Sequence, residues 1–479
     1  MIVHKFGGTS LGNAERIAAV AGIIDASQQD TPTVVVVSAM SGATDHLIAG
    51  AHAAATDDAA ACRSAQDWLA DRHHTVVNRL LALSPECSEL HNIIDERLDH
   101  LGRFLDSISV LGELTARGHD AVACFGEQFS AAIVVAALGC RGVKAQSISA
   151  TDLIVTDNHF GAASPQMGTT RKRVNERVRP LVDAGIVPVI TGYVGATEDG
   201  VPTTLGRSGS DFSAAVIVAC LEAAELRIWT DVDGILTADP NVVPNARVLR
   251  ELSYEEATRL ALFGAEVLHP RTIGPIIEHS VPLCILNCFN PGDPGTRIVE
   301  SPAASRRLWP AIVSAAGLRL IRLRSRNGTW QLRSAIEALA RLDNAGIAVQ
   351  MFSQSFSEQG MILVFDEQDG ERGARLLSQR FAESNLPLLG GYVVDTMEKV
   401  ATVSVIGLPC DRRAGIASRA FAALGKHDTR VVAVTQAATE DSVTFCIPNE
   451  DVAETVRFLH RELGLDNSEE EGINSAGQG

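Results

Sequence analysis

Short apolar runs that end in glycine-rich loops are the feature that most restricts the fold of this chain. Residues 2–6 (IVHKF) lead into a Gly-Gly-Thr-Ser loop, and residues 33–37 (TVVVV) form a β-branched run without alternation. Such a run is typical of a parallel strand that is covered on both faces. The pattern recurs at residues 186–191 and 226–230. It predicts an α/β fold with a mainly parallel sheet and covering helices.

The middle of the N-terminal half has a different character. From about residue 59 to 117, leucines and isoleucines recur at helical spacing without a strand-like run. We interpret this stretch as a helical insertion on the α/β core. Residues 291–310 contain Pro-Gly-Asp-Pro-Gly and Ser-Pro-Ala-Ala-Ser, which interrupt every periodic pattern. A domain boundary is therefore expected there.

The part of the chain beyond this boundary contains an internal repeat. Residues 349–354 (VQMFSQ) align with residues 431–436 (VVAVTQ), and residues 338–340 (ALA) align with residues 420–422 (AFA). Each copy has the order strand, helix, strand, turn, strand, which is typical of a small ferredoxin-like module. The sequence after Leu465 is polar, and we expect a frayed tail.

Charge and composition restrict the partners of the chain. Its 58 acidic and 41 basic side chains give a net charge of −17, which repels polyanions. Aromatic residues make up 5 %, so platforms for stacking bases are scarce. The N-terminus does not resemble a signal peptide, no apolar run approaches about 18 residues, and the cysteines lack CxxC spacing. We expect a cytoplasmic protein with small-molecule substrates and neither nucleic acid nor membrane as a partner.

The glycine-rich loops should lie at the carboxyl ends of the strands, where open parallel sheets bind their ligands. The first loop runs from Lys5 to Ser10 and offers backbone N–H groups, a helix N-terminus and a cation, all of which favour a phosphate. It is not a Walker P-loop, because its lysine precedes the glycines. Taken alone, a tight connection without function is the alternative.

Residues 203–211 (TTLGRSGSD) form a second loop of this kind. Ser210 can cap the helix that follows, which is the structural interpretation. The charged residues favour a functional one, since Arg207 can hold a carboxylate with two hydrogen bonds and Asp211 can orient a cation or the lysine.

Other acidic residues lie near strand and helix ends. Asp231, Asp233 and Asp239 surround one strand end, and Glu127 opens an apolar helix. Turn formation and a favourable interaction with the helix dipole are the alternatives to a functional role. His269 lacks a partner at metal-ligand spacing, and we interpret it as structural.

Five ordered segments together resemble the aspartokinases of the amino-acid kinase fold. They are KFGGTS (5–10), VVVSA (35–39), LGRSGSD (205–211), WTDVDG (229–234) and FGAEVLHP (263–270). The helical insertion is similar to that of the kinase half of bifunctional aspartokinase–homoserine dehydrogenases, and the repeat resembles paired ACT domains, which bind amino-acid effectors. The resemblance implies a kinase domain at 1–300, ACT domains at 311–398 and 399–466, and a flexible tail at 467–479.

The resemblance implies transfer of the γ-phosphoryl group of ATP, with Mg²⁺, to the side-chain carboxylate of L-aspartate. The product would be 4-phospho-L-aspartate, in the first step of lysine, threonine and methionine biosynthesis. Because the carboxylate is already ionised at neutral pH, positioning and charge neutralisation should dominate the reaction.

The resemblance also implies a role for individual residues. Glu127 would bind the substrate ammonium group, and Arg207 its α-carboxylate. The implied residues are Lys5 and Asp211 for catalysis, Ser38, Thr44, Glu127, Arg207 and Ser210 for aspartate, and Gly7, Gly8, Thr9, Thr230, Asp231, Thr237 and Asp239 for the nucleotide. No residue is predicted to be a dedicated metal ligand.

The repeat resembles a regulatory module. Gln354 and Gln436 match glutamines that sense threonine in the bifunctional relatives, so threonine is the preferred effector and lysine the second choice. Solvent-facing strand ends are the structural alternative. Exposed β-edges in ACT-like units often pair between chains, and we expect a homodimer or homotetramer.

The chain departs from its relatives in two places. Many relatives carry a lysine where this chain has Glu266, and a carboxylate cannot attract phosphate there. Lys5, Arg207 and Asp211 remain, so we expect activity. No GxGxxG motif follows the repeats, and we expect a monofunctional kinase without a dehydrogenase half. A catalytically weak amino-acid sensor and a sibling kinase for glutamate or acetylglutamate remain the alternatives.

Overall fold

The computed structural model describes residues 1–82, 86–264, 268–303, 310–326, 330–355, 359–381, 392–407, 416–436 and 442–466. Glu266 and the tail expected at 467–479 lie outside these residues. The chain divides into two compact units. The first comprises Met1–Ile235, Arg250–Leu262 and Glu266–Arg306, and the second comprises Leu236–Leu249, Phe263–Ala265 and Arg307–Gly479.

The first unit is built on an eight-stranded sheet of order β3-β5-β2-β1-β8-β10-β11-β9. Its strands are β1 (Ile2–Phe6), β2 (Thr33–Val37), β3 (Ala145–Ile148), β5 (Val187–Thr191), β8 (Glu225–Thr230), β9 (Glu251–Ser253), β10 (Leu283–Asn287) and β11 (Thr296–Val299). The neighbours from β3 to β10 pair in parallel, and only the pair of β10 with β11 is antiparallel. The predicted α/β fold with a mainly parallel sheet is confirmed.

Helices surround this sheet, whose strands carry apolar residues on both sides. They are α1 (Ala14–Asp30), α2 (Ala43–Ala55), α5 (Ala116–Ala123), α6 (Phe125–Gly139), α7 (Met167–Arg177), α8 (Arg179–Asp183), α9 (Gly209–Leu221), α10 (Tyr254–Leu262) and α11 (Pro270–Glu278), with short 3-10 turns at Thr9–Leu11 and Ala150–Asp152. Helices α1, α6, α8, α9 and α10 pack on the strands, and the others pack on neighbouring helices. Phe6, Val35 and Val37 share a core with α1 and α6. Side chains alternate along a strand, so Lys5 projects toward the opposite face, where α9 contacts β1.

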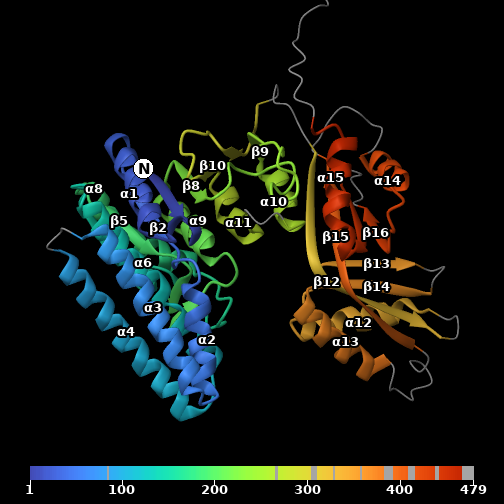
Figure 1. Ribbon diagram of the computed structural model, residues 1–479, viewed down its shortest axis with the longest axis horizontal. Coiled ribbons are helices and arrows are strands. Elements are labelled where there is room, and N and C mark those ends of the chain that lie inside the picture. The colour runs from blue at the N-terminus through green and yellow to red at the C-terminus, as the bar shows by residue number, and fades with distance from the viewer. Residues whose placement is uncertain are drawn as a thin grey trace, which may run out of the picture. The chain divides into compact units, whose positions relative to one another are not determined.

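A small sheet and a helical extension complete the first unit. The sheet has the order β4-β6-β7, formed by Val155–Thr156, Val194–Thr197 and Pro202–Thr204. Helices α3 (Ala59–Leu80) and α4 (Glu86–Leu111) run beside α2 at one end of the unit (Figure 1). Leu69 and Leu101 are buried between them. These helices confirm the predicted helical insertion.

One helical stretch, Ala116–Gly139, is long and apolar enough to span a membrane by composition. It comprises α5 and α6, and 78 % of its most apolar window is buried inside the protein. Ala131, Ile133 and Val134 belong to the core cluster beneath the sheet. Burial of this kind is what a core helix of an α/β protein requires.

The second unit contains a six-stranded sheet of order β13-β14-β12-β15-β17-β16. The strands are β12 (Ala311–Ser325), β13 (Met351–Ser355), β14 (Gly360–Phe365), β15 (Tyr392–Ile406), β16 (Ala433–Gln436) and β17 (Ser442–Pro448). Helices α12 (Leu332–Asn344), α13 (Glu367–Phe381), α14 (Ile416–Lys426) and α15 (Val452–Glu462) pack on it, and a 3-10 turn spans Asn449–Asp451.

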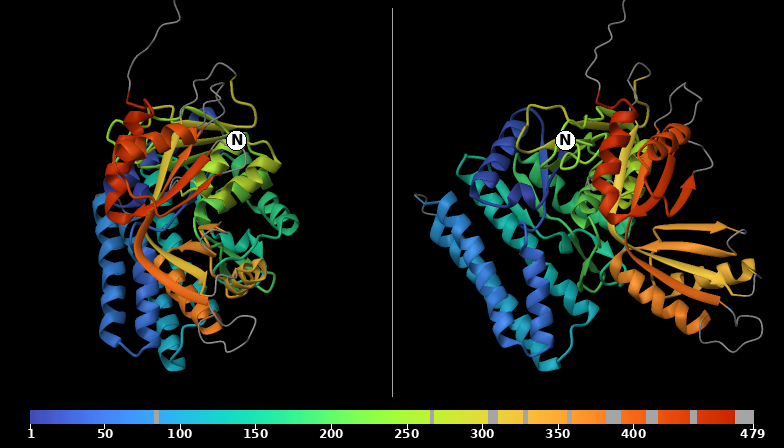
Figure 2. Two further views of the ribbon diagram at one scale, coloured as in Figure 1. Left: turned by 90° about the vertical axis from the view of Figure 1, so that its right-hand side faces the viewer. Right: turned by 45° about the vertical axis from the view of Figure 1, so that its right-hand side comes forward.

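The two repeats of the second unit share their central strands. The first half of β12 pairs with the second half of β15 beside β17, and the second half of β12 pairs with the first half of β15 beside β14. Figure 2 shows both long strands continuing from one half of the sheet into the other. A register shift near Gly317, whose φ is +71°, separates the halves. The border expected at residues 398/399 therefore falls inside a strand that both ferredoxin-like modules use.

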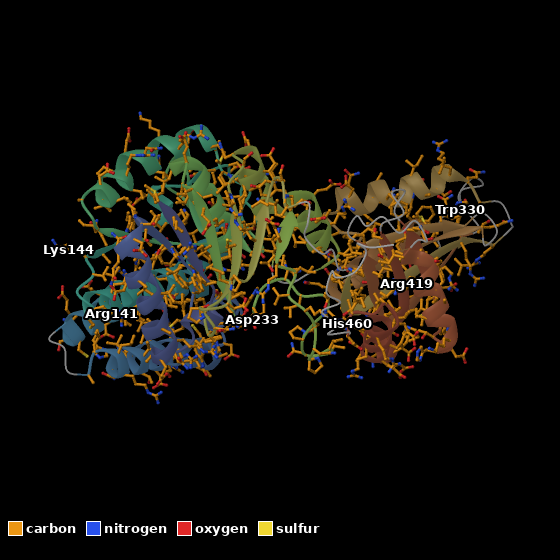
Figure 3. The ribbon with its side chains drawn as sticks, turned by 90° about the horizontal axis from the view of Figure 1, so that it is seen from above. Arg141, Lys144, Asp233, Trp330, Arg419 and His460 are labelled. Atoms are coloured by element: carbon orange, nitrogen blue, oxygen red, sulfur yellow. The ribbon has the colours of Figure 1, made fainter. Side chains whose placement is uncertain are left out.

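The segment Leu236–Leu249 belongs to the second unit by its packing. Ala238 and Val243 share a core with Phe445 and Leu459. The hydroxyl of Thr237 is fully buried and lies 3.1 Å from Nε2 of His460, a residue of α15 that Figure 3 labels. A loop that follows strand β8 in sequence is thus held by the last helix of the repeat.

Candidate active site

The candidate active site lies at the carboxyl edge of the parallel sheet. Strands β1, β2, β5 and β8 are parallel neighbours, so the loops that follow them emerge at the same edge. The Nζ atom of Lys5 lies 2.6 Å from Oδ1 of Asp211, and these side chains are only 11 % and 14 % exposed. The pair joins the carboxyl end of β1 to the first turn of α9, and it places a cation in a largely desolvated position.

Gly8 allows the loops after β1 and β2 to approach each other closely. A Cβ atom on Gly8 would lie 2.8 Å from the carbonyl oxygen of Ala39, which is closer than a side chain tolerates. A Cβ atom on Gly7 would lie 3.6 Å from Nζ of Lys5. The amide of Ser41 donates to the carbonyl of Gly8. The loop after β1 therefore packs its backbone directly on the loop after β2, with Lys5 beside the glycines; Thr9 is exposed.

Glu127 is buried in the first turn of α6, with an exposed fraction of 2 %. Its Oε1 accepts a hydrogen bond of 3.1 Å from the amide of Ala39, and its Oε2 has no partner among the described residues. Burial raises the pKa of this carboxyl to about 8, which hydrogen bonding to Ala39 and the charge of Lys5 oppose. An incoming cation would complete the coordination of Oε2 and stabilise the ionised form.

The loop before α9 contributes one exposed and one buried polar residue. Arg207 is exposed, and no ion pair is recorded for it within the described part of the chain. Ser210 is 8 % exposed and contacts the backbone at Gly192, where a Cβ atom would lie 2.8 Å from that of Ser210.

His269 caps α11 by accepting from the amide of Arg271, in keeping with a structural role. Ser38 and Thr44 are partly exposed at the end of β2 and the start of α2.

The loop after β8 carries two aspartates, of which Asp231 is exposed and Asp233 is held by two asparagines. The Thr230 hydroxyl donates to Oδ1 of Asp231, and Asp231 is exposed. Asp233, labelled in Figure 3, accepts hydrogen bonds from the side-chain amide groups of Asn287 and Asn290, which fixes the loop. Asp231 is therefore available to solvent or a ligand, whereas Asp233 is engaged in holding the turn.

Four of the predicted site residues belong to the second unit. Thr237 is buried against His460, and Asp239 is exposed and bonds to its own turn through Asn241. Gln354 is partly exposed on β13, and Gln436 is exposed on β16. The structure thus assembles Lys5, Asp211 and Glu127 in the first unit and places Thr237 and Asp239 with the repeat.

Three residues near the site escaped sequence analysis. Tyr193 follows β5 with a φ of +68°, a conformation unusual for a bulky side chain, and a Cβ atom on Gly209 would lie 2.6 Å from its ring. Trp68 stacks on His46 beside Gly42, and Arg72 donates to the carbonyl of Gly12. Helix α3 therefore contacts both the segment after β1, at Gly12, and the segment after β2, at Gly42. The short Gly-Tyr pair after an apolar run was the only signal for Tyr193.

The donor set fits a nucleotide-borne Mg²⁺ better than a dedicated metal cage. No group of three or more His, Cys, Asp or Glu side chains is close enough to hold a metal in the described part of the chain. In kinases Mg²⁺ is held mainly by phosphates and water with one or two carboxylates. Asp211, which is paired with Lys5, and the exposed Asp231 are the carboxylates that could face such an ion.

Comparison with known proteins identifies the family of the chain. The profile of the amino acid kinase family matches residues 1–287, and an ACT domain profile matches residues 403–463. E. coli aspartokinase III in complex with aspartate and ADP superposes with a TM-score of 0.82 at 26 % identity, over 97 % of this chain and 99 % of that chain. The lysine- and aspartate-bound form of the same protein gives a TM-score of 0.77. The family match over residues 1–287 and the similar fold of this relative place the chain in the amino acid kinase family.

The curated relatives define the class further. A bifunctional aspartokinase/homoserine dehydrogenase of Arabidopsis thaliana is 32 % identical over 97 % of this chain, but the chain spans only 50 % of that relative. Arabidopsis aspartokinase 2 is 30 % identical over 96 % of this chain and 83 % of its own length. The chain therefore belongs to the aspartokinases of the amino acid kinase family.

Proposed function

We propose that the chain transfers the γ-phosphoryl group of ATP to the side-chain carboxylate of L-aspartate, as the first step of lysine, threonine and methionine biosynthesis. The observation that carries this proposal is the buried 2.6 Å ion pair of Lys5 and Asp211 at the carboxyl edge of a parallel sheet. The aspartate- and ADP-bound relative of closely similar fold supports the choice of both substrates.

Each residue has a role that its position supports. Lys5 stabilises the charge of the transferring phosphoryl group, and Asp211 holds the ammonium group of Lys5 in place. The amides near Gly7, Gly8 and Thr9 would bind phosphate oxygens. Arg207 would bind the α-carboxylate of L-aspartate and Glu127 its ammonium group, and Ser38, Thr44 and Ser210 would complete the aspartate site. Thr230 and Asp231 would contact the nucleotide.

Mg²⁺ would enter with ATP and neutralise its phosphates. Asp211 and Asp231 are the residues of this chain that would face it, directly or through water. The nucleotide role predicted for Thr237 and Asp239 has less support, because Thr237 is buried against His460.

The proposed activity is tested by trapping the acyl phosphate. Full-length protein is incubated with ATP, Mg²⁺, hydroxylamine and one of L-aspartate, L-glutamate or N-acetyl-L-glutamate. Aspartyl hydroxamate should form, and the other acids should give none above the blank. A hydroxamate formed only from glutamate or its acetyl derivative would indicate a sibling kinase. A blank value with all three acids would contradict the kinase assignment.

Glu127 should make substrate binding dependent on pH. Since burial raises the pKa of its carboxyl to about 8, much of the ligand-free protein carries a neutral Glu127 at pH 7. The KM for L-aspartate should therefore fall by several-fold as the pH rises through about 8. Glu127→Gln should show a higher KM that no longer falls over this range, while the exposed Glu198→Gln should follow the wild type.

The same residue should affect stability. The folded-state pKa of about 8 lies above the ordinary value of 4.5 for a glutamate, so the native state binds more protons than the unfolded state between these values. The free energy of unfolding should fall as the pH rises through this window. Glu127→Gln should remove that loss and be more stable than the wild type at pH 8. An identical pH dependence of Tm in both proteins would contradict the pKa shift.

Regulation through the second unit is the next part of the proposal. We expect threonine to inhibit, with lysine as the second choice, through Gln354 and Gln436. These residues occupy matching positions on the outer strands β13 and β16. Replacing either by Ala should raise the threonine concentration for half-inhibition by up to about ten-fold, the upper end of the effect of losing one hydrogen bond to the effector. Gln146→Ala on β3 is the matched control, and insensitivity of the wild type to both amino acids would contradict this assignment.

The outer strands also suggest an assembly. The edge strand β13 carries Phe352, which is 55 % exposed, and unpaired edges of this kind pair readily between chains. We propose a cytoplasmic homodimer or homotetramer, to be checked by light scattering with and without threonine.

A further inference from the structure

Asp120 is a fully buried carboxylate that sequence analysis did not select. It lies in α5, and no part of it is exposed. Its Oδ2 accepts hydrogen bonds from the amides of Gly161 at 2.8 Å and Thr204 at 2.9 Å. Its Oδ1 accepts from the hydroxyl of Thr204 at 2.8 Å, and Nδ1 of His119 lies 3.4 Å away. A buried carboxylate is stable only when hydrogen-bond donors surround it, so the fold requires Gly161 and Thr204 to stay next to Asp120.

The donors belong to the loop that carries the proposed substrate residues. Thr204 is the last residue of β7, three positions before Arg207 and six before Ser210. Because Asp120 binds both the amide and the hydroxyl of Thr204, it fixes the direction in which this loop leaves the strand. Gly206 has a φ of +80°, and a Cβ atom there would lie 3.2 Å from the carbonyl oxygen of Gly161. The second donor segment therefore lies directly against the start of the loop.

Other contacts hold the same loop from its far side. Arg271 donates to the carbonyl of Leu205 at 2.7 Å and to that of Ala163 at 3.2 Å. The amide of Leu205 donates to the carbonyl of Tyr193. These bonds hold the backbone of the loop. Asp120 adds a link to the α5–α6 stretch, because its carboxylate accepts hydrogen bonds from the amide and the hydroxyl of Thr204.

The α5–α6 stretch also carries Glu127. Helix α5 ends at Ala123 and α6 begins at Phe125, and the amide of Cys124 donates to the carbonyl of Asp120. One continuous stretch thus presents two carboxylates. Glu127 reaches the loop after β2 through Ala39, and Asp120 reaches the loop after β7 through Thr204. The distance between the two sides of the substrate site depends on both.

We propose that Asp120 is a positioning residue that sets the placement of Arg207 and Ser210 relative to Glu127. The inference rests on the proposed function, since it assigns those residues to the amino-acid substrate. Asp120 touches no reacting atom in this assignment. It acts through Thr204 and Gly161.

The chemistry of the network separates three variants. In Asp120→Asn, the amide oxygen can accept from both N–H groups, and the amide NH₂ can donate to the Thr204 hydroxyl, whose hydrogen turns away. Asp120→Ala leaves both amides and the hydroxyl without their acceptor. Thr204→Val removes the hydroxyl and keeps the amide bond. The loss of affinity for L-aspartate should therefore be smallest in Asp120→Asn, larger in Thr204→Val and largest in Asp120→Ala.

Steady-state kinetics of the full-length variants test the proposal. Asp120→Ala should raise the KM for L-aspartate about ten-fold or more, because small misplacements of binding groups have large effects, and should change the KM for ATP less than about two-fold. Asp120→Asn should recover most of this loss. Leu101→Ala, a core substitution in α4, is the control for general destabilisation and should leave both KM values near those of the wild type. Equal rises in both KM values, or a rise in Leu101→Ala as large as that in Asp120→Ala, would overturn the proposal.

A second measurement does not depend on activity. In Asp120→Ala, amide hydrogen exchange should become faster at residues 204–211 and remain unchanged at residues 5–10. If the wild type made no aspartyl phosphate but this exchange pattern held, the proposed function would fail while the positioning role of Asp120 in the loop stood. Unchanged exchange at residues 204–211 would overturn the positioning role itself.

Discussion

Replacing Lys5 by Ala should lower kcat for aspartyl phosphate formation by about 10³-fold, because one preorganised donor of this kind contributes up to that factor. Lys5 is the buried cation at the carboxyl edge of the sheet, 2.6 Å from Asp211. Its charge would act on the phosphoryl group during transfer, where low exposure makes it most effective. Hydroxamate formation under saturating ATP and L-aspartate measures the change.

Lys172→Ala is the matched control, since this lysine is 75 % exposed on α7 and its ion pair with Glu176 is long at 4.0 Å. It should leave turnover unchanged. Thermal unfolding should show that Lys5→Ala remains folded, although Asp211 then lacks its cation. Turnover of Lys5→Ala within three-fold of the wild type would remove Lys5 from the mechanism.

Replacing Arg207 by Ala should raise the KM for L-aspartate by about 10- to 100-fold, which corresponds to the loss of a charge-assisted hydrogen-bonded pair. The KM for ATP should change little, because the guanidinium is assigned to the α-carboxylate. Arg207→Lys should recover only part of the affinity, since an ammonium group cannot bind a carboxylate with two parallel hydrogen bonds. Initial rates at varied aspartate and fixed saturating ATP give both constants.

Arg207 is exposed, so its loss should change the free energy of unfolding by less than about 0.5 kcal/mol. Stability and binding are therefore separable for this variant. Arg63→Ala, at an exposed position of α3, controls for the change in net charge. A rise in the KM for ATP with no rise for aspartate would move Arg207 to the nucleotide side of the site.

The fold could be predicted because its signals are local and repeated. The β-branched run of β2 is buried throughout, and each such run ends in a loop at the same edge of the sheet. The alignment of residues 349–354 with 431–436 likewise indicated two copies of one module, and both segments include outer strands of one sheet. The sharing of β12 and β15 between the modules could not be predicted from the sequence. A strand of doubled length has the same residue pattern as two ordinary strands with a bulge between them.

The site could be predicted where a charged residue stands next to a glycine-rich loop. Lys5 comes just before such a loop at the end of β1, Asp211 comes just after one in the first turn of α9, and the structure brings them together. Asp120 could not be selected, because it lies inside a helix and its partners are 41 and 84 residues away. The packing of Thr237 was equally hidden, since its hydroxyl meets His460, which is 223 residues away. Glu266 lies outside the described residues, and its effect stays a prediction.

The membership of Leu236–Leu249 in the second unit has a practical consequence for dissecting the protein. A fragment truncated near residue 300, where sequence composition places a border, would retain this segment but lose Phe445, Leu459 and His460, against which it packs. Ala238 and Val243 would then be exposed to water in the segment that follows strand β8. Such a fragment should aggregate or turn over poorly because of this exposed surface, so the proposed effector control is better tested through point substitutions in the intact polypeptide.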